Sequence, residues 1–205
     1  MNLERLAWWQ RALLAAAVHL VLLAIFPLLR PAYAPFFRAF GELGVRTLDP
    51  LPGPIEAHFA PGSGGPLARD HVAMDTIVTL EHPELTGRGS FGASSLFHGW
   101  WPTSVLCALL WIATPCPRRL GGTLLALAGL HLFIVLRCAL AAFYCHAKSS
   151  VDGQPLVPLS PAAERALFLA WHFGWDEMLA NYLVPLVLWS LFALGVRSPA
   201  RPSNG

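Results

Sequence analysis

The chain has 205 residues, of which 55% are hydrophobic and only 13% charged, and its mean hydropathy is +0.52. Soluble domains carry about 25% charged residues, so a water-soluble fold of this length would have nowhere to bury so much apolar surface. The net charge of +2, with no basic stripe among interleaved aromatic residues, speaks against a nucleic-acid partner. The composition therefore predicts one membrane domain over residues 1–205, with the lipid bilayer as its first partner.

Four apolar stretches predict an all-α polytopic fold. A helix needs about 20 apolar residues to cross the hydrocarbon core of a bilayer, and about 17 suffice. The predicted spans cover residues 12–29, 98–114, 122–144 and 179–196. The second stretch reaches this length only if His98 and Gly99 belong to it.

The first stretch has an alternative interpretation as a cleaved signal peptide, because Ala32-Tyr33-Ala34 is typical of a cleavage site. Its apolar run is longer than a usual signal core, however, and Arg30 interrupts the approach to that site. We therefore expect an uncleaved membrane anchor.

The charges of the short loops predict the orientation, because Lys and Arg concentrate on the cytoplasmic side. With the N-terminus inside, the cytoplasmic pieces are residues 1–11, 115–121 and 197–205, which carry six arginines and one acid. The outer segments, residues 30–97 and 145–178, carry most of the acidic residues. Four spans then leave both termini in the cytoplasm.

The first outer segment is expected to form a small extracytoplasmic cap. Ala34–Leu48 predicts an amphipathic helix that lies at the interface. Its expected lipid-facing residues are Phe36, Phe37, Phe40 and Leu43. The Pro- and Gly-rich segment 50–66 predicts a loop. The alternation over residues 72–80 predicts a short strand and Gly87-Arg88-Gly89 a turn, so the cap is expected to hold a short β-hairpin.

The second outer segment begins as a loop and then predicts a helix. Ser160, Pro161 and Glu164 combine an N-cap, a first-turn proline and an acid near the positive end of a helix. This helix is expected to run from Pro161 towards Asp176.

Arg137 is the most informative residue, because it lies inside the third apolar stretch. A charge at the bilayer centre costs roughly 2.5–3.5 kcal/mol on insertion scales. One interpretation is that the side chain snorkels to the interface, which relieves the cost. The interpretation we favour is a guanidinium that faces a polar cleft between helices.

His172 and Asp176 lie four residues apart and share one face of the helix predicted from Pro161. Asp176 is placed to accept a hydrogen bond from His172 and fix its tautomer, or to neutralise Arg137. The plain alternative is an interfacial helix with an ordinary polar face.

His98 follows Ser94 and Ser95 by four and three residues, so their side chains can meet on a helix at the outer mouth of the second span. A Ser–His pair suits nucleophilic catalysis, but the sequence offers neither a third member nor an oxyanion hole. His98 is also a candidate binding residue.

The remaining cysteines and histidines predict no further chemistry. None of the four cysteines belongs to a Cys-x-x-Cys pair, so all are expected to be free: Cys107, Cys116, Cys138 and Cys145. The outer histidines lack the spacing of metal ligands. We expect neither a metal ion nor another cofactor.

From the second span onward the chain carries Trp101-Pro102, Thr114-Pro115, Arg118-Arg119, a Gly-rich span with Leu136-Arg137, and His172 ahead of the last span. This order resembles the exosortase/archaeosortase family over residues 70–196. Members of that family are membrane-embedded, transpeptidase-like proteins thought to cleave C-terminal sorting tails from exported proteins. The resemblance implies a multi-pass protein of the bacterial inner membrane with a periplasmic-facing site. It also implies that Arg137 and His172 match two of the family's three catalytic residues.

The third family residue, a cysteine in a short Cys-Ser/Thr-Gly stretch, does not match. Ser94 or Ser95 stands at that position, and Val135-Leu136 stands where the family has an asparagine just ahead of the arginine. A thiolate attacks readily, whereas a serine hydroxyl needs a well-placed base. The missing cysteine therefore argues against cleavage.

We accordingly predict an exosortase-like membrane protein that binds or guides sorting tails, or a partner exosortase, without cutting. Arg137 and His172 would line a cleft that recognises a carboxylate or backbone carbonyls. One alternative is an active enzyme with Ser94, Ser95 or Cys145 as nucleophile and His172 as base. Another is an unrelated four-span scaffold or assembly protein.

Overall fold

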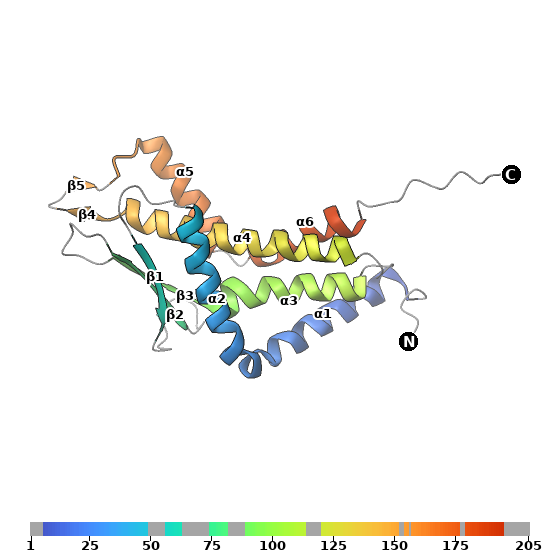
Figure 1. Cartoon of the computed structure of the whole chain (residues 1–205). Coiled ribbons are helices and arrows are strands. Elements are labelled where there is room, and N and C mark those ends of the chain that lie inside the picture. The colour runs from blue at the N-terminus through green and yellow to red at the C-terminus, as the bar shows by residue number, and fades with distance from the viewer. Residues whose placement is uncertain are drawn as a thin grey trace.

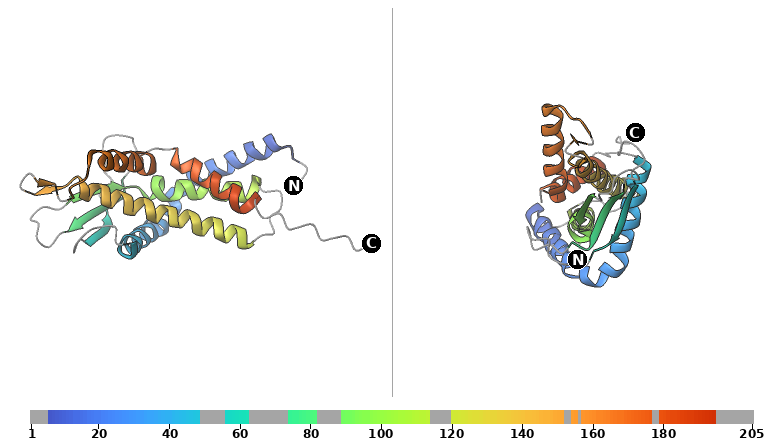
Figure 2. Two further views of the ribbon diagram at one scale, coloured as in Figure 1. Left: turned by 90° about the horizontal axis from the view of Figure 1, so that it is seen from above. Right: turned by 90° about the vertical axis from the view of Figure 1, so that its left-hand side faces the viewer.

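The computed structural model of this chain describes residues 6–48, 56–62, 74–81, 89–113, 120–151, 154–155, 157–176 and 179–194. Over these residues the protein is mostly helical, with one small antiparallel sheet (Figure 1). Helices α1, α3, α4 and α6 form a lengthwise bundle, α2 crosses it, and the sheet lies at one end of it (Figures 1 and 2). The prediction of a predominantly helical protein with a small cap is confirmed.

The helices are α1 (Trp8–Ala24), α2 (Phe26–Leu48), α3 (Trp101–Ala108), α4 (Leu120–Ala147), α5 (Pro161–Trp171) and α6 (Ala180–Trp189). The π-helical segments are η2 (Ser95–Trp100), η3 (Leu109–Ala113), η4 (His172–Asp176) and η5 (Ser190–Leu194). The strands are β1 (Glu56–Pro61), β2 (Thr76–Glu81), β3 (Gly89–Ala93), β4 (Ser150–Val151) and β5 (Gln154–Pro155). In chain order η2, α3 and η3 follow one another directly, and η4 and η5 directly follow α5 and α6.

The helix that covers the first predicted span, 12–29, is broken, and the bounds of that span stay a prediction. Helix α1 stops at Ala24, and α2 leaves it at an angle of 73°. Pro27 explains the break, because proline has no N–H for the helix ladder and disfavours helical backbone in the residue before it. The indole Nε1 of Trp100 donates to the carbonyl of Leu22 at 2.9 Å, which satisfies one carbonyl at the end of α1.

Helix α2 contains the predicted interfacial helix but starts eight residues earlier, at Phe26. Leu28 and Leu43 are 82% and 61% exposed, whereas Phe37 is 2% exposed, so the expectation that Phe37 faces lipid is wrong. Phe37 lies on the face that packs on the protein. On that face a Cβ added to Gly44 would lie 2.3 Å from Cγ1 of Val135, so α2 and α4 approach as closely as glycine allows.

The cap holds a three-stranded sheet in the order β1-β2-β3, which is one strand more than the predicted hairpin. The strand predicted over 72–80 is confirmed as β2, where buried and less buried residues alternate. The prediction of a loop over 50–66 is wrong over Glu56–Pro61, which forms β1 and pairs with β2; residues 50–55 and 63–66 lie outside the described residues. Few residues of β1 have high β-propensity, so its pairing partner decides its conformation.

The later elements follow the predicted order. The second, third and fourth predicted spans correspond to η2–α3–η3 (95–113), α4 (120–147) and α6–η5 (180–194). The helix predicted from Pro161 is confirmed as α5 followed by η4. Its N-cap forms as expected, since the Ser160 hydroxyl accepts a hydrogen bond from the Ala163 N–H.

Among the described helices, α4 is the one that is long and apolar enough by itself to cross a bilayer, over Gly121–Ala147. Helices α1 and α2 meet the same test only as a bent pair, and the apolar stretch Ala180–Phe192 is shorter. The structure is therefore compatible with a membrane protein. The four-span arrangement stays a prediction.

Candidate functional site

Polar side chains, most of them buried, gather where the helical bundle meets the sheet. They form two clusters: an arginine cluster made of His98, Arg137, Trp175 and Asn181, and an acid cluster made of Arg30, Asp75, Thr76 and Ser95. The π-helical segment η2 and the Ser94 that caps it join the two clusters, because Ser95 and His98 lie one turn apart on it.

Arg137 lies at the centre of the first cluster and is 2% exposed, so it points into the protein and does not snorkel. Its Nη1 donates to Oδ1 of Asn181 and its Nη2 to the backbone carbonyl of Trp175, each at 2.7 Å. Three aromatic rings surround the guanidinium, with centroids 5.6 to 5.9 Å from Cζ; they belong to Phe97, Phe133 and Trp175. Hydrogen bonds and cation–π contacts thus stabilise the buried charge.

Two donors in this cluster have no partner. They are Nε of Arg137 and Nδ2 of Asn181, and both are fully buried. Among the described side chains no carboxylate forms an ion pair with Arg137. A buried donor without an acceptor costs about 1–3 kcal/mol, and more for a charged group. The cluster therefore has two buried donors that a further hydrogen-bond acceptor would satisfy.

His98, which the sequence indicates as a candidate binding residue, belongs to the arginine cluster. Its ring stacks on Trp175 with the centroids 3.9 Å apart and the planes at 15°. The backbone N–H of Ser94 donates to Nδ1 of His98 at 2.9 Å, so Nδ1 is the acceptor and the proton of the neutral ring lies on Nε2. His98 is 2% exposed and positions Trp175 over the guanidinium.

His172 lies three residues before Trp175 and is half-buried. Its ring is parallel to that of Phe168, with the centroids 5.9 Å apart, and it also contacts Phe173. The predicted convergence of His172 and Arg137 on one pocket stays a prediction. The backbone of Asp176 ends η4, and the predicted role of its side chain lies outside the described part of the structure.

Asp75 organises the second cluster and was not predicted as a site residue. Its carboxylate is 5% exposed and accepts hydrogen bonds from the N–H of Ser95 at 2.8 Å and from its hydroxyl at 2.5 Å. Arg30 donates to the same carboxylate from Nε at 3.2 Å. The carboxylate thus binds the first N–H of η2, which favours an anion at this helix end, and ties α2 to the cap.

The two candidate serines have structural partners. The hydroxyl of Ser94 accepts from the N–H of Phe97 at 3.2 Å, as an N-cap does, and the hydroxyl of Ser95 donates to Asp75. Ser94 meets His98 through its backbone N–H and not through its hydroxyl. Neither hydroxyl therefore hydrogen-bonds to His98, the imidazole that the sequence places nearest to them as a candidate base.

The described cysteines, Cys107, Cys138 and Cys145, carry free thiols, and Cys116 lies outside the described residues. No group of three or more metal-ligating side chains occurs within the described ranges. Comparison of the chain with protein-family models, with curated proteins and with solved structures found no match.

Sequence reasoning missed Asp75, Trp175 and Asn181. One signal was available for Asn181, because a lone amide at the start of an apolar helix is a polar group that needs a partner. Asp75 directly precedes the alternating strand β2 but is separated from its partner Ser95 by 20 positions. Such a pairing becomes visible only when the three strands are in register.

Proposed function

We propose that the chain is a four-span protein of the bacterial inner membrane with both termini in the cytoplasm. Exposed leucines on α1, α4, α6 and η5 support this arrangement. They are Leu13, Leu20, Leu124, Leu132, Leu183 and Leu191, each 52% to 64% exposed. Lipid accommodates such a surface, whereas in water a large exposed apolar patch promotes association. In Figure 1 the start of α1 and the end of α6 also lie at the end of the bundle opposite to the sheet.

Within this arrangement we propose that the protein is an exosortase-like accessory component. It binds or guides a C-terminal sorting tail, or a partner exosortase, at the outer face of the membrane and does not cut the tail. The resemblance to exosortases and the lack of their cysteine suggest this role. The geometry of the arginine cluster supports it.

One observation carries the proposal: two unpartnered donors, Nε of Arg137 and Nδ2 of Asn181, lie buried in one cluster, and no carboxylate of the described side chains pairs with the guanidinium. A carboxylate or a pair of backbone carbonyls supplies the acceptors that these atoms lack. Trp175 is 5% exposed and covers the guanidinium. Binding therefore includes a displacement of the Trp175 side chain.

The contacts of the serines support binding over cleavage. The Ser94 hydroxyl caps a helix, and the Ser95 hydroxyl donates to a carboxylate that also binds Arg30, so neither hydroxyl is paired with an imidazole base. We expect Ser94→Ala, Ser95→Ala and Cys145→Ala each to leave the processing of sorting tails in cells unchanged. If one of them abolished processing, the protein would be an enzyme and the accessory role would be wrong.

The binding role is tested by co-purification of a tagged exosortase from the same cells with the chain. Arg137→Met keeps the length and packing of the side chain but removes the charge and all donors. We expect this variant to insert normally and to lose co-purification, because the acceptors of the partner then have no donor. Binding of a synthetic tail peptide that ends in a free carboxylate is measured in parallel with its amidated form.

The matched control is Arg46→Met. Arg46 is an exposed arginine on α2, paired only with Glu42 one turn away, at 3.2 Å. This variant is expected to co-purify like the parent protein. Normal co-purification of the Arg137→Met protein, or equal loss in both variants, would contradict a recognition role for the buried guanidinium.

A further inference from the structure

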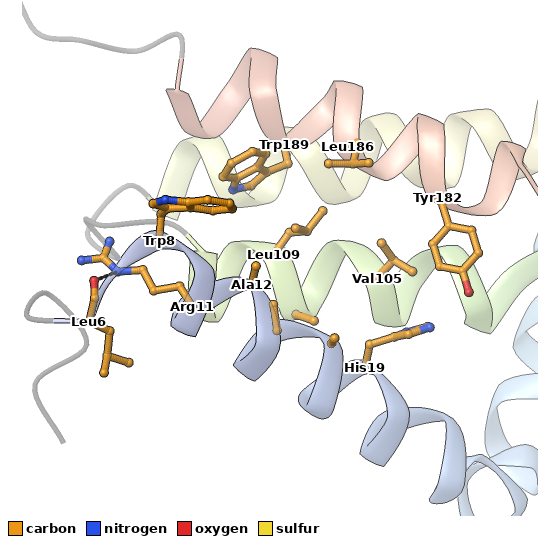
Figure 3. A pocket seen from close by; sticks show the side chains of 13 residues that line it. Leu6, Trp8, Arg11, Ala12, His19, Val105, Leu109, Tyr182, Leu186 and Trp189 are labelled. Atoms are coloured by element: carbon orange, nitrogen blue, oxygen red, sulfur yellow. Dashed lines mark hydrogen bonds between the residues drawn. The ribbon is translucent and has the colours of Figure 1, made fainter.

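A second feature lies away from both polar clusters: a groove of about 710 Å³ between α1 and α6, with α3 and η3 as its floor (Figure 3). Small residues of α1, Ala12, Ala15 and Ala16, leave the space that forms it. Its volume lies within the range of about 300–1,000 Å³ that is typical of ligand sites. Nearly all of its lining is apolar.

The two ends of the groove differ in chemistry. Arg11, Trp8 and Trp189 lie at the end near the start of α1, and the Nε of Arg11 donates to the carbonyl of Leu6, which holds the guanidinium there (Figure 3). At the other end His19 and Tyr182 close the groove, with their ring centroids 5.9 Å apart. The groove is thus cationic and aromatic at one end and closed at the other.

The length of the groove matches one leaflet. From Trp8 to His19 the helix rises about 16 Å at about 1.5 Å per residue, which is half of a hydrocarbon core about 30 Å thick. In the proposed orientation the cationic end lies at the cytoplasmic interface, where Trp residues also gather. The closed end then lies near the bilayer midplane.

We propose that this groove binds one acyl chain of an anionic phospholipid of the inner leaflet, with the lipid phosphate at Arg11. Basic sites between helices on the cytoplasmic side recognise anionic headgroups, and the guanidinium forms charge-assisted hydrogen bonds with phosphate oxygens. The inference rests on the four-span orientation proposed above but not on the role of Arg137.

A transmembrane helix of a partner is the competing occupant, and it fits less well. Such a helix crosses both leaflets and needs a face that continues past the midplane. The groove ends at His19, which Ser104 fixes through a hydrogen bond of 2.9 Å to Nδ1 and which Trp101 also contacts. A single acyl chain ends within one leaflet and needs no continuation.

The test uses the full chain purified in a mild detergent and native mass spectrometry with added phosphatidylglycerol or phosphatidylcholine. We expect one tightly held phosphatidylglycerol per chain and weaker binding of phosphatidylcholine. Arg11→Gln is expected to lower the affinity for phosphatidylglycerol about fivefold, the effect of about one basic residue at a membrane surface. Arg11→Lys should retain most of the preference.

Ala16→Phe fills the groove, and Ala17→Phe is its matched control, because Ala17 is exposed on the same helix but does not line the groove. Only the first should lose the bound lipid. Equal lipid binding by both variants, or no preference for phosphatidylglycerol in the parent protein, overturns the proposal. Cross-linking of an Ala16→Cys thiol to a membrane protein and not to lipid would instead identify a helical partner.

A topology assay separates this inference from the proposal on which it rests. Alkaline phosphatase inserted after Gly62 should be active, and a fluorescent protein fused to the N-terminus should fluoresce in the cytoplasm. If both hold and the Ala16→Phe protein still binds lipid normally, the groove inference alone is wrong. If the N-terminus is outside, the four-span orientation is wrong.

Discussion

Substitutions of Asn181 test how the buried charge of Arg137 affects the stability of the protein and its binding of a ligand. Replacing Asn181 by leucine keeps a branched side chain at this position but removes the acceptor that lies 2.7 Å from Nη1 of Arg137. A hydrogen bond to a charged group contributes about 1.5–3 kcal/mol. Because Arg137 is 2% exposed, water cannot replace the lost acceptor without rearrangement. We therefore expect Asn181→Leu to lower the free energy of unfolding by about 2–3 kcal/mol.

Asn181→Asp reverses the sign of this effect. A carboxylate at that position accepts a charge-assisted hydrogen bond about twice as strong as a neutral one and compensates the guanidinium, so unfolding should require as much free energy as in the parent protein or more. The same carboxylate takes the place of the acceptor that a sorting tail would supply. We therefore expect this variant to be stable and yet to lose binding of the tail peptide.

Reversible unfolding in mixed micelles, followed by circular dichroism, gives the stability, and the peptide assay gives the binding. Ser190→Ala is the control, because Ser190 lies just after α6 and its exposed hydroxyl only donates to the carbonyl of Leu186. The reasoning is refuted if Asn181→Leu changes stability no more than Ser190→Ala does. It is also refuted if Asn181→Asp binds the peptide as the parent protein does, because compensation of the charge would then be irrelevant.

Three further substitutions test the fold and the site. Gly44→Val should lower the melting temperature, because overpacking costs about 1–3 kcal/mol and the new side chain would overlap Val135. Leu43→Val is the control, because Leu43 is exposed, and it should leave the melting temperature unchanged. Asp75→Asn should lower the free energy of unfolding, measured with a chemical denaturant, by about 1–3 kcal/mol, because it weakens the acceptors for both Ser95 donors. Unchanged stability would show that the acid cluster does not hold the cap. Trp175→Ala should uncover the guanidinium and raise the affinity for the carboxylate peptide relative to its amidated form, and an equal change for both peptides would contradict selective recognition by Arg137.

The fold could be predicted where one segment decides its own structure. The long apolar run of α4 and the cap and proline at the start of α5 act locally, so the sequence indicates them. Pro27 also carried a signal for the break after α1, but the continuous apolar run outweighed it. Strand β1 could not be predicted, because its backbone conformation depends on pairing with β2.

The site was predictable in part for the same reason. Arg137 was identifiable, because a charge in an apolar run has no local explanation. Its partners are 38 and 44 positions away, and nothing in their own neighbourhoods marks them as partners of an arginine. His98 was weighed with the nearby serines because they are adjacent in sequence. The π-helical segment instead turns its ring onto Trp175.

Stability alone does not explain why this protein keeps an arginine at this position. In the proposed four-span arrangement a charge inside the bilayer costs up to roughly 2.5–3.5 kcal/mol, the value at the bilayer centre on insertion scales, and the unpaired Nε adds about 1–3 kcal/mol. Replacing buried ionic groups by well-packed apolar ones is often neutral or stabilising by about 1–4 kcal/mol. Snorkelling does not relieve the cost, because the side chain turns inward onto Asn181 and Trp175. A charge held at this cost, with donors left over, is the arrangement expected of a binding site whose acceptor arrives with the ligand.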